Sequence, residues 1–134
     1  LDAYNEARRN AARKYTQAFK EIDKIITPTG FCDVGAGICD TCDCHVFHQY
    51  TLRMKDVDRD ALAKHLNENG IPCGIYYPIP LHLQKAYRDS KYDEADFEVT
   101  NELVKEVISL PMHTELDDVQ IDFITQTVID FVQK

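Results

Sequence analysis

No apolar run in this sequence approaches the roughly 20 residues that a membrane-spanning helix requires, and the amino end lacks the basic and apolar regions of a signal peptide. An excess of basic residues is missing as well, since the net charge is −8 and the sequence pI is about 5.0. Nucleic acids and anionic membranes attract basic surfaces, so we expect neither as a partner. These absences predict a soluble, cytoplasmic protein.

The chain also lacks the length of a complete enzyme with a large cofactor site. Its 134 residues are enough for one domain, residues 1–134, with a single hydrophobic core. The sequence starts at Leu1 without a methionine and runs at once into a helical pattern. We therefore expect further sequence upstream of Leu1.

Four segments carry apolar residues at the three- and four-residue spacing of amphipathic helices. The spacing predicts a long first helix over Tyr4–Ile22. Aspartates suited to N-terminal caps precede the other three helices, which we expect to begin after Asp58, Asp96 and Asp117. Gly70 is suited to end the second helix in a left-handed conformation.

The segments between these helices are rich in β-branched and aromatic residues. They predict strands over Val46–Met54 and Cys73–Tyr77 and an extended segment over Ser109–Met112. Short strands that alternate with helices predict an α+β fold: a small three-stranded mixed or antiparallel sheet with helices mainly on one face. The other face then needs a cover, so we expect this domain to dock on a larger unit.

The segment Gly70–Gln84 has the features of a binding loop. Two prolines, two residues apart, fix their own φ angles and hold the preceding residues extended, which restricts the polar side chains nearby. The pattern predicts a ligand-contacting loop that presents Tyr76, Tyr77 and His82, and we expect the backbone to set the position of His82. The alternative is a rigid connection whose tyrosines fill the core.

Cysteines and histidines gather before and at the start of the first predicted strand. The cluster comprises Cys32, Cys39, Cys42, Cys44, His45 and His48. Such side chains can hold zinc tetrahedrally, but only one Cys-x-x-Cys pair is present and glycines make the loop costly to close. We therefore expect no tightly held metal and a loop of reduced thiols. A freestanding metal- or protein-binding module that uses the Cys32–Cys44 cluster is the second functional hypothesis.

Four separated blocks of the sequence together resemble a known family, in its order and at about its spacing. The blocks are Leu1–Arg9, His45–Arg53, Gly70–Gln84 and Ser109–His113 with Glu115 and Leu116. They resemble the carboxy-terminal domain of the DegT/DnrJ/EryC1/StrS family, whose members are pyridoxal-phosphate-dependent aminotransferases acting on nucleotide-linked keto-sugars. The resemblance covers nearly the whole chain apart from Pro28–Cys44.

The resemblance implies that this chain is the small domain of a fold-type I aminotransferase. In such enzymes the Schiff-base lysine and the phosphate-binding residues lie in an amino-terminal domain, upstream of the position that matches Leu1. By this resemblance the chain holds no catalytic or cofactor-binding residue, and the fragment alone is inactive. Pyridoxal phosphate then belongs to the full-length parent and not to this fragment.

The same resemblance implies partners and site residues. The partners are the amino-terminal cofactor-binding domain, a nucleotide-sugar substrate and a second copy of the enzyme in a homodimer, with a role in polysaccharide biosynthesis. The implied substrate-binding residues are Tyr76, Tyr77 and His82, where the tyrosines wall the sugar and His82 donates a hydrogen bond to a sugar hydroxyl or phosphate oxygen. The lysines of the chain lie in polar segments, which favours solvated surface positions over catalysis.

Overall fold

The computed structural model describes residues 1–29, 31–32, 35–36 and 45–134. The α-helices are α1 (Asp2–Phe19), α2 (Arg59–Glu68), α3 (Glu98–Glu106) and α4 (Asp118–Val132). The strands are β1 (Ile25–Ile26), β2 (Phe31–Cys32), β3 (Gly35–Ala36), β4 (Tyr50–Met54) and β5 (Val107–Leu110). Two 3₁₀ helices, η1 (Leu81–Leu83) and η2 (Glu94–Phe97), complete the described elements.

The main sheet has three antiparallel strands in the order β1-β4-β5, which confirms the predicted α+β class and settles the sheet as antiparallel. Tyr50 of β4 lies opposite Leu110 of β5. The predicted strand over Cys73–Tyr77 is wrong. Only Gly74 pairs there, through two backbone hydrogen bonds with Ser109 of 3.0 and 2.7 Å. Prolines on both sides of this segment lack the N–H groups that a longer ladder needs.

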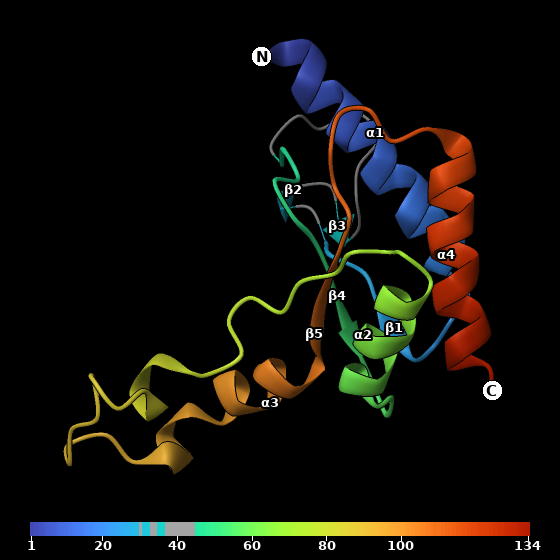
Figure 1. Cartoon of the computed structure of the whole chain (residues 1–134). Helices are drawn as coiled ribbons and strands as arrows, with labels where there is room; N and C mark the ends of the chain where they lie inside the picture. Colours follow the sequence, from blue (N-terminus) through green and yellow to red (C-terminus); the bar gives the residue numbers. More distant parts are fainter. Residues whose placement is uncertain (30, 33–34, 37–44) are drawn as a thin grey trace.

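The core lies on one face of the sheet, where α1, α2 and α4 pack (Figure 1). Side chains alternate along β4, and Tyr50, Leu52 and Met54 are buried while Thr51 and Arg53 are less so. The buried residues join one cluster that also contains Tyr15 of α1. The expectation that helices lie mainly on one face is thus confirmed, and Thr51 and Arg53 belong to the opposite face.

The ends of the helices follow local chemistry. The carboxylate of Asp58 accepts the N–H of Ala61 at 2.9 Å, and Asp117 forms a complete capping box with Gln120. Gly70 has φ +73°, as expected for a residue that ends a helix. The prediction for Asp96 is wrong, because it lies inside η2, which Asp93 caps. None of the described helices is long and apolar enough to cross a membrane.

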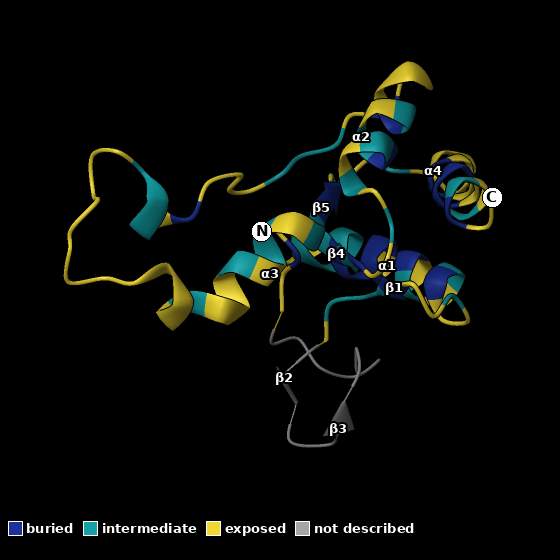
Figure 2. Ribbon diagram, turned by 90° about the horizontal axis from the view of Figure 1, so that it is seen from below, coloured by how far each residue is buried: buried dark blue, intermediate teal, exposed yellow. Residues whose placement is uncertain are grey.

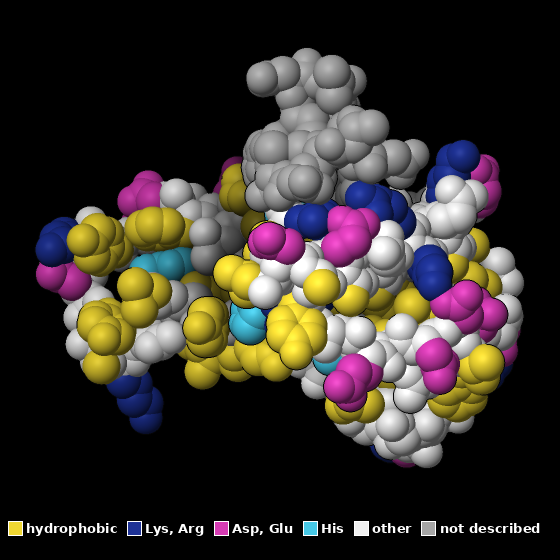
Figure 3. All heavy atoms as spheres, turned by 90° about the horizontal axis from the view of Figure 1, so that it is seen from above, with side chains coloured by type: hydrophobic (Ala, Val, Ile, Leu, Met, Phe, Trp, Pro, Cys, Tyr) yellow, Lys and Arg dark blue, Asp and Glu magenta, His cyan; other side chains and the backbone are white. Residues whose placement is uncertain are grey.

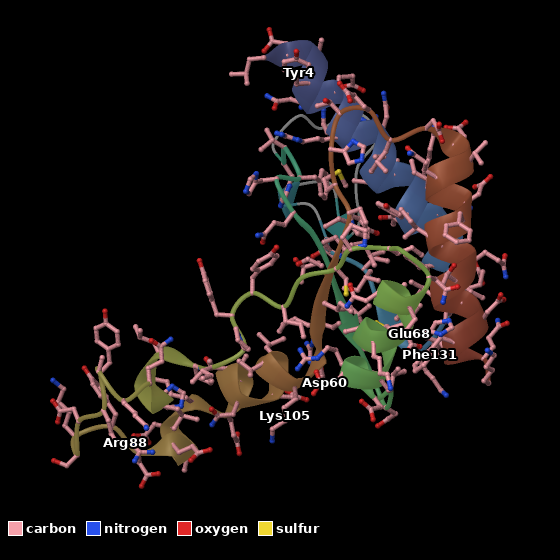
Figure 4. All side chains as sticks on the ribbon, viewed as in Figure 1. Tyr4, Asp60, Glu68, Arg88, Lys105 and Phe131 are labelled. Atoms are coloured by element: carbon pink, nitrogen blue, oxygen red, sulfur yellow. The ribbon has the colours of Figure 1, made fainter. Side chains whose placement is uncertain are left out.

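Residues 76–106 leave the body of the domain as a long excursion, which we call the arm. The chain runs outward through η1, turns at the far end near Arg88, and returns through η2 and α3 into β5 (Figures 1 and 4). Figure 2 shows that the arm is largely exposed, in contrast to the buried centre of the domain. The predicted binding loop therefore belongs to the outgoing half of a projecting element.

Candidate functional site

The predicted tyrosines line a hollow at the base of the arm, which we call the proximal hollow. It has a volume of about 630 Å³ and lies between the outgoing loop and α3. Its walls include Tyr76, Tyr77 and Ile79 on one side and Leu103 and Val104 on the other. Tyr76 and Tyr77 are 54% and 78% exposed, so they do not fill the core as the alternative interpretation of the loop requires.

His82 faces a second hollow farther along the arm, the distal hollow, of about 570 Å³. Tyr87, Tyr92 and Phe97 line it, together with Lys91, whose ammonium lies 4.8 Å from the centre of the Tyr92 ring. Figure 3 shows hydrophobic side chains gathered around a histidine on the arm. His82 is thus close to Tyr76 and Tyr77 in the sequence, but it lines a different hollow.

The imidazole of His82 is held by two side chains of the returning half of the arm. Its ring stacks on Phe97 with centroids 4.2 Å apart and an interplanar angle of 16°. Its Nε2 lies 3.1 Å from Oδ1 of Asn101. The expectation that the backbone alone sets the position of His82 is therefore wrong.

The ring of Tyr76 packs against the backbone of Gly74. A Cβ atom added to Gly74 would lie only 2.6 Å from the hydroxyl oxygen of Tyr76. It would also clash with two carbon atoms of the Tyr76 ring. Because Gly74 is also hydrogen-bonded to Ser109 at the sheet edge, the ring of Tyr76 rests directly on a fixed stretch of backbone. Gly74 therefore belongs to the site because the absence of a side chain leaves room for the ring of Tyr76.

We expect Gly74→Ala to move the ring of Tyr76 while costing less than about 1 kcal/mol of stability, because the far end of a side chain can swing aside. Gly70→Ala is the matched control, since Gly70 has φ +73° and no atom within 4 Å of the added Cβ. That control should cost about 1 kcal/mol through backbone strain and leave Tyr76 in place. Urea unfolding and crystal structures of both variants test this, and an unmoved Tyr76 in Gly74→Ala contradicts it.

The base of the arm is fastened by two arginines that sequence patterns did not identify. The guanidinium of Arg59, with its side chain only 10% exposed, donates through Nη1 to the carbonyl oxygens of Val104 at 3.0 Å and Val107 at 2.7 Å. On the outer face of the sheet, Arg53 forms a charged hydrogen bond of 2.8 Å from Nε to Glu106. Both contacts fix the last turn of α3 to the body of the domain.

The remaining candidates carry less chemistry. His48 is exposed just before β4 and borders a hollow of about 300 Å³ with Tyr76 and Cys73. Burial raises the pKa of the Cys73 thiol, whose sulfur lies 3.7 Å from the carbonyl oxygen of Ala63. The predicted cysteine cluster falls mainly outside the described residues, including Cys39, Cys42 and Cys44. Within the described part of the chain, no group of three or more potential metal ligands comes together.

The lysines bear on whether this chain can hold an aldehyde cofactor. Every lysine of the chain is exposed. A lysine that acts as a nucleophile at neutral pH needs a desolvated or cationic setting, and these surface positions offer neither. None of the lysines thus has the surroundings of a Schiff-base lysine within the described structure.

The described geometry is that of a small α+β domain with a projecting arm, and solved structures match its fold over nearly the whole chain. DesV of S. venezuelae matches it with a TM-score of 0.84 at 26% identity, over 100% of this chain and 33% of DesV. NtdA of Bacillus subtilis, solved with bound PMP, matches with a TM-score of 0.75 at 19% identity, over 98% of this chain and 29% of NtdA. The model of the DegT/DnrJ/EryC1/StrS aminotransferase family matches residues 1–129, and the chain belongs to this family.

Curated relatives agree with this assignment. A pleiotropic regulatory protein of Geobacillus stearothermophilus is 36% identical, over 98% of this chain and 33% of the relative. A UDP-N-acetyl-3-dehydro-α-D-glucosamine 3-aminotransferase of Acidithiobacillus ferrooxidans is also 36% identical, over 90% of this chain and 29% of the relative. The chain thus spans about a third of the length of the curated relatives it matches.

Proposed function

We propose that this chain is the carboxy-terminal, substrate-side domain of a pyridoxal-phosphate-dependent aminotransferase that transfers an amino group to a nucleotide-linked keto-sugar. The observation that carries the proposal is the family match over residues 1–129, joined with relatives whose names specify nucleotide-sugar amination. The partner is an amino-terminal cofactor-binding domain. When bound there, pyridoxal phosphate supplies the electron sink for amino transfer.

Within this function, Tyr76, Tyr77 and His82 are the residues that this chain contributes to substrate binding. The two tyrosine rings offer apolar faces and hydroxyl groups, which suit the mixed surface of a sugar. Their exposure in the isolated domain is what a pocket completed by a second domain requires. Apolar side chains of the arm, including Ile79 and Leu81, are exposed as well, which supports a homodimer or interdomain contact along the arm. We place the enzyme in the cytoplasm, in polysaccharide biosynthesis.

The test compares the isolated chain with the complete enzyme that carries it. We expect the complete enzyme to show the absorbance of bound pyridoxal phosphate and to aminate UDP-N-acetyl-3-dehydro-α-D-glucosamine or a related keto-sugar nucleotide. The isolated chain should show neither, because its lysines are solvated. A stoichiometric, borohydride-trappable cofactor adduct at one lysine of the isolated chain contradicts the division of roles. A complete enzyme that binds the cofactor but aminates no nucleotide-linked sugar contradicts the substrate class.

A further inference from the structure

The loop with the two tyrosines is suspended between two fixed points. At its start, Gly74 is bound to the sheet edge by its paired hydrogen bonds with Ser109. Beyond Tyr77 the chain has only four residues, two of them prolines, before His82. The second fixed point is His82, which lies in η1. A hydrogen bond of 3.0 Å from Leu83 N–H to the carbonyl oxygen of Pro80 closes this 3₁₀ turn. Whatever holds His82 therefore limits where Tyr76 and Tyr77 lie.

The hydrogen-bond network assigns the proton on His82. The amide nitrogen of Asn101 donates to the carbonyl oxygen of Glu94 at 2.8 Å, which leaves Oδ1 of Asn101 to face the imidazole. An amide oxygen only accepts, so Nε2 of His82 is the protonated nitrogen and the donor. Asn101 thus connects the outgoing half of the arm, at His82, to the returning half, at Glu94. Phe97 supplies the surface on which the imidazole stacks.

From this geometry we propose that His82, Asn101 and Phe97 form a latch that positions the tyrosine loop, so that His82 serves substrate binding through the loop and not by contacting the substrate. The proposal deepens the role of the substrate pocket and rests on the proposed function. It makes Asn101 and Phe97 positioning residues, although neither lies near the tyrosines in sequence. The Nε2–H of His82, the group best suited to a sugar oxygen, is already used inside the arm.

The test uses the complete enzyme with His82→Ala, Asn101→Ala and the double variant. Hydrogen exchange of the peptide covering residues 75–84 measures the latch without any activity, and each variant should raise its rate by about tenfold. The KM for UDP-N-acetyl-3-dehydro-α-D-glucosamine should rise by about tenfold with kcat changed less than about twofold, because the cofactor side is untouched. The double variant should be no worse than either single one, since both remove the same contact.

Two variants serve as controls. Asn101→Asp keeps an oxygen to accept the Nε2–H but loses the donor to the carbonyl oxygen of Glu94, so it should recover only part of the exchange protection and of the KM. Lys105→Ala, an exposed change on the same helix (Figure 4), should alter neither. Should Asn101→Ala fail to fold, Phe97→Leu removes the stacking surface and carries the same expectation.

The outcomes separate the alternatives. A raised KM in His82→Ala with wild-type behaviour in Asn101→Ala overturns the latch, because His82 then contacts the substrate itself. Unchanged exchange in both single variants overturns it as well. If the wild-type enzyme aminates no keto-sugar nucleotide, the proposed function fails, and the exchange measurements still decide whether the latch exists.

Discussion

Arg59→Ala should lower the free energy of unfolding by about 2–3 kcal/mol and loosen the base of the arm. The side chain is nearly buried and donates to two backbone carbonyls at the end of α3, those of Val104 and Val107. Hydrogen bonds from a charged donor are worth more than neutral ones, and truncation leaves both acceptors without this partner. Urea unfolding measures the stability, and hydrogen exchange of the last turn of α3 measures the loosening.

Lys64→Ala on the same helix is the matched control for this prediction. Lys64 lies 3.8 Å from Glu68 in an ion pair whose side chains are 77% and 62% exposed, so its removal should cost less than about 0.5 kcal/mol. Arg59→Lys should fall between the two, because one ammonium cannot replace both Nη1, which donates to the two carbonyls, and Nε, which donates to Asp60. Equal stabilities of the Arg59→Ala and Lys64→Ala variants show that Arg59 does not fasten the arm.

The parts of the fold that the sequence predicts are those set by near neighbours along the chain. Asp58 and Asp117 cap helices because each accepts an N–H three residues ahead, and the alternation through Tyr50 and Leu52 marks one buried face. β1 has only two residues, Ile25 and Ile26, too few to show a strand period. Its place in the sheet depends on pairing with β4, which lies more than twenty residues away.

In the candidate site, too, the sequence predicts the local features but not the contacts between distant residues. The prolines around Tyr76 and Tyr77 mark a restrained loop, and the structure confirms that these rings are exposed on it. No local pattern points to Asn101, because its contact with His82 spans 19 residues and requires the arm to fold back on itself. The contacts of Arg59 span 45 and 48 residues. Polar side chains that act across such separations look like ordinary surface residues in a sequence.

The stability of this domain should fall steeply above pH 10. Tyr15 and Tyr50 are fully buried, with ring centroids 5.0 Å apart, and burial raises the pKa of both phenols above the ordinary value of about 10. For Tyr50, the hydrogen bond with Thr16 opposes this shift but does not cancel it. The folded state therefore keeps both protons at a pH where the unfolded chain releases them.

The sign of the effect follows from this difference in proton binding. Below pH 10 both states carry the phenol protons, so the stabilisation is fully present; above pH 10 the unfolded state gains free energy by ionising, and the folded state does not. Two such groups lower the free energy of unfolding by about 2.7 kcal/mol per pH unit once the unfolded phenols are ionised. Urea unfolding between pH 9.5 and 11 measures this slope.

Phenylalanine variants decide whether these two phenols cause the fall. Tyr15→Phe and Tyr50→Phe each keep the ring in the core but lose a hydrogen bond, to the carbonyl oxygen of Pro111 and to Thr16 respectively, which costs about 1 kcal/mol at neutral pH. Each should nevertheless halve the alkaline slope, and the double variant should nearly abolish it. Because burial also raises the pKa of Cys73, all proteins in the series carry Cys73→Ala, which removes the contribution of the thiol. If the double variant loses stability with pH as steeply as the parent, ionisation of the two buried tyrosines is not what unfolds the domain.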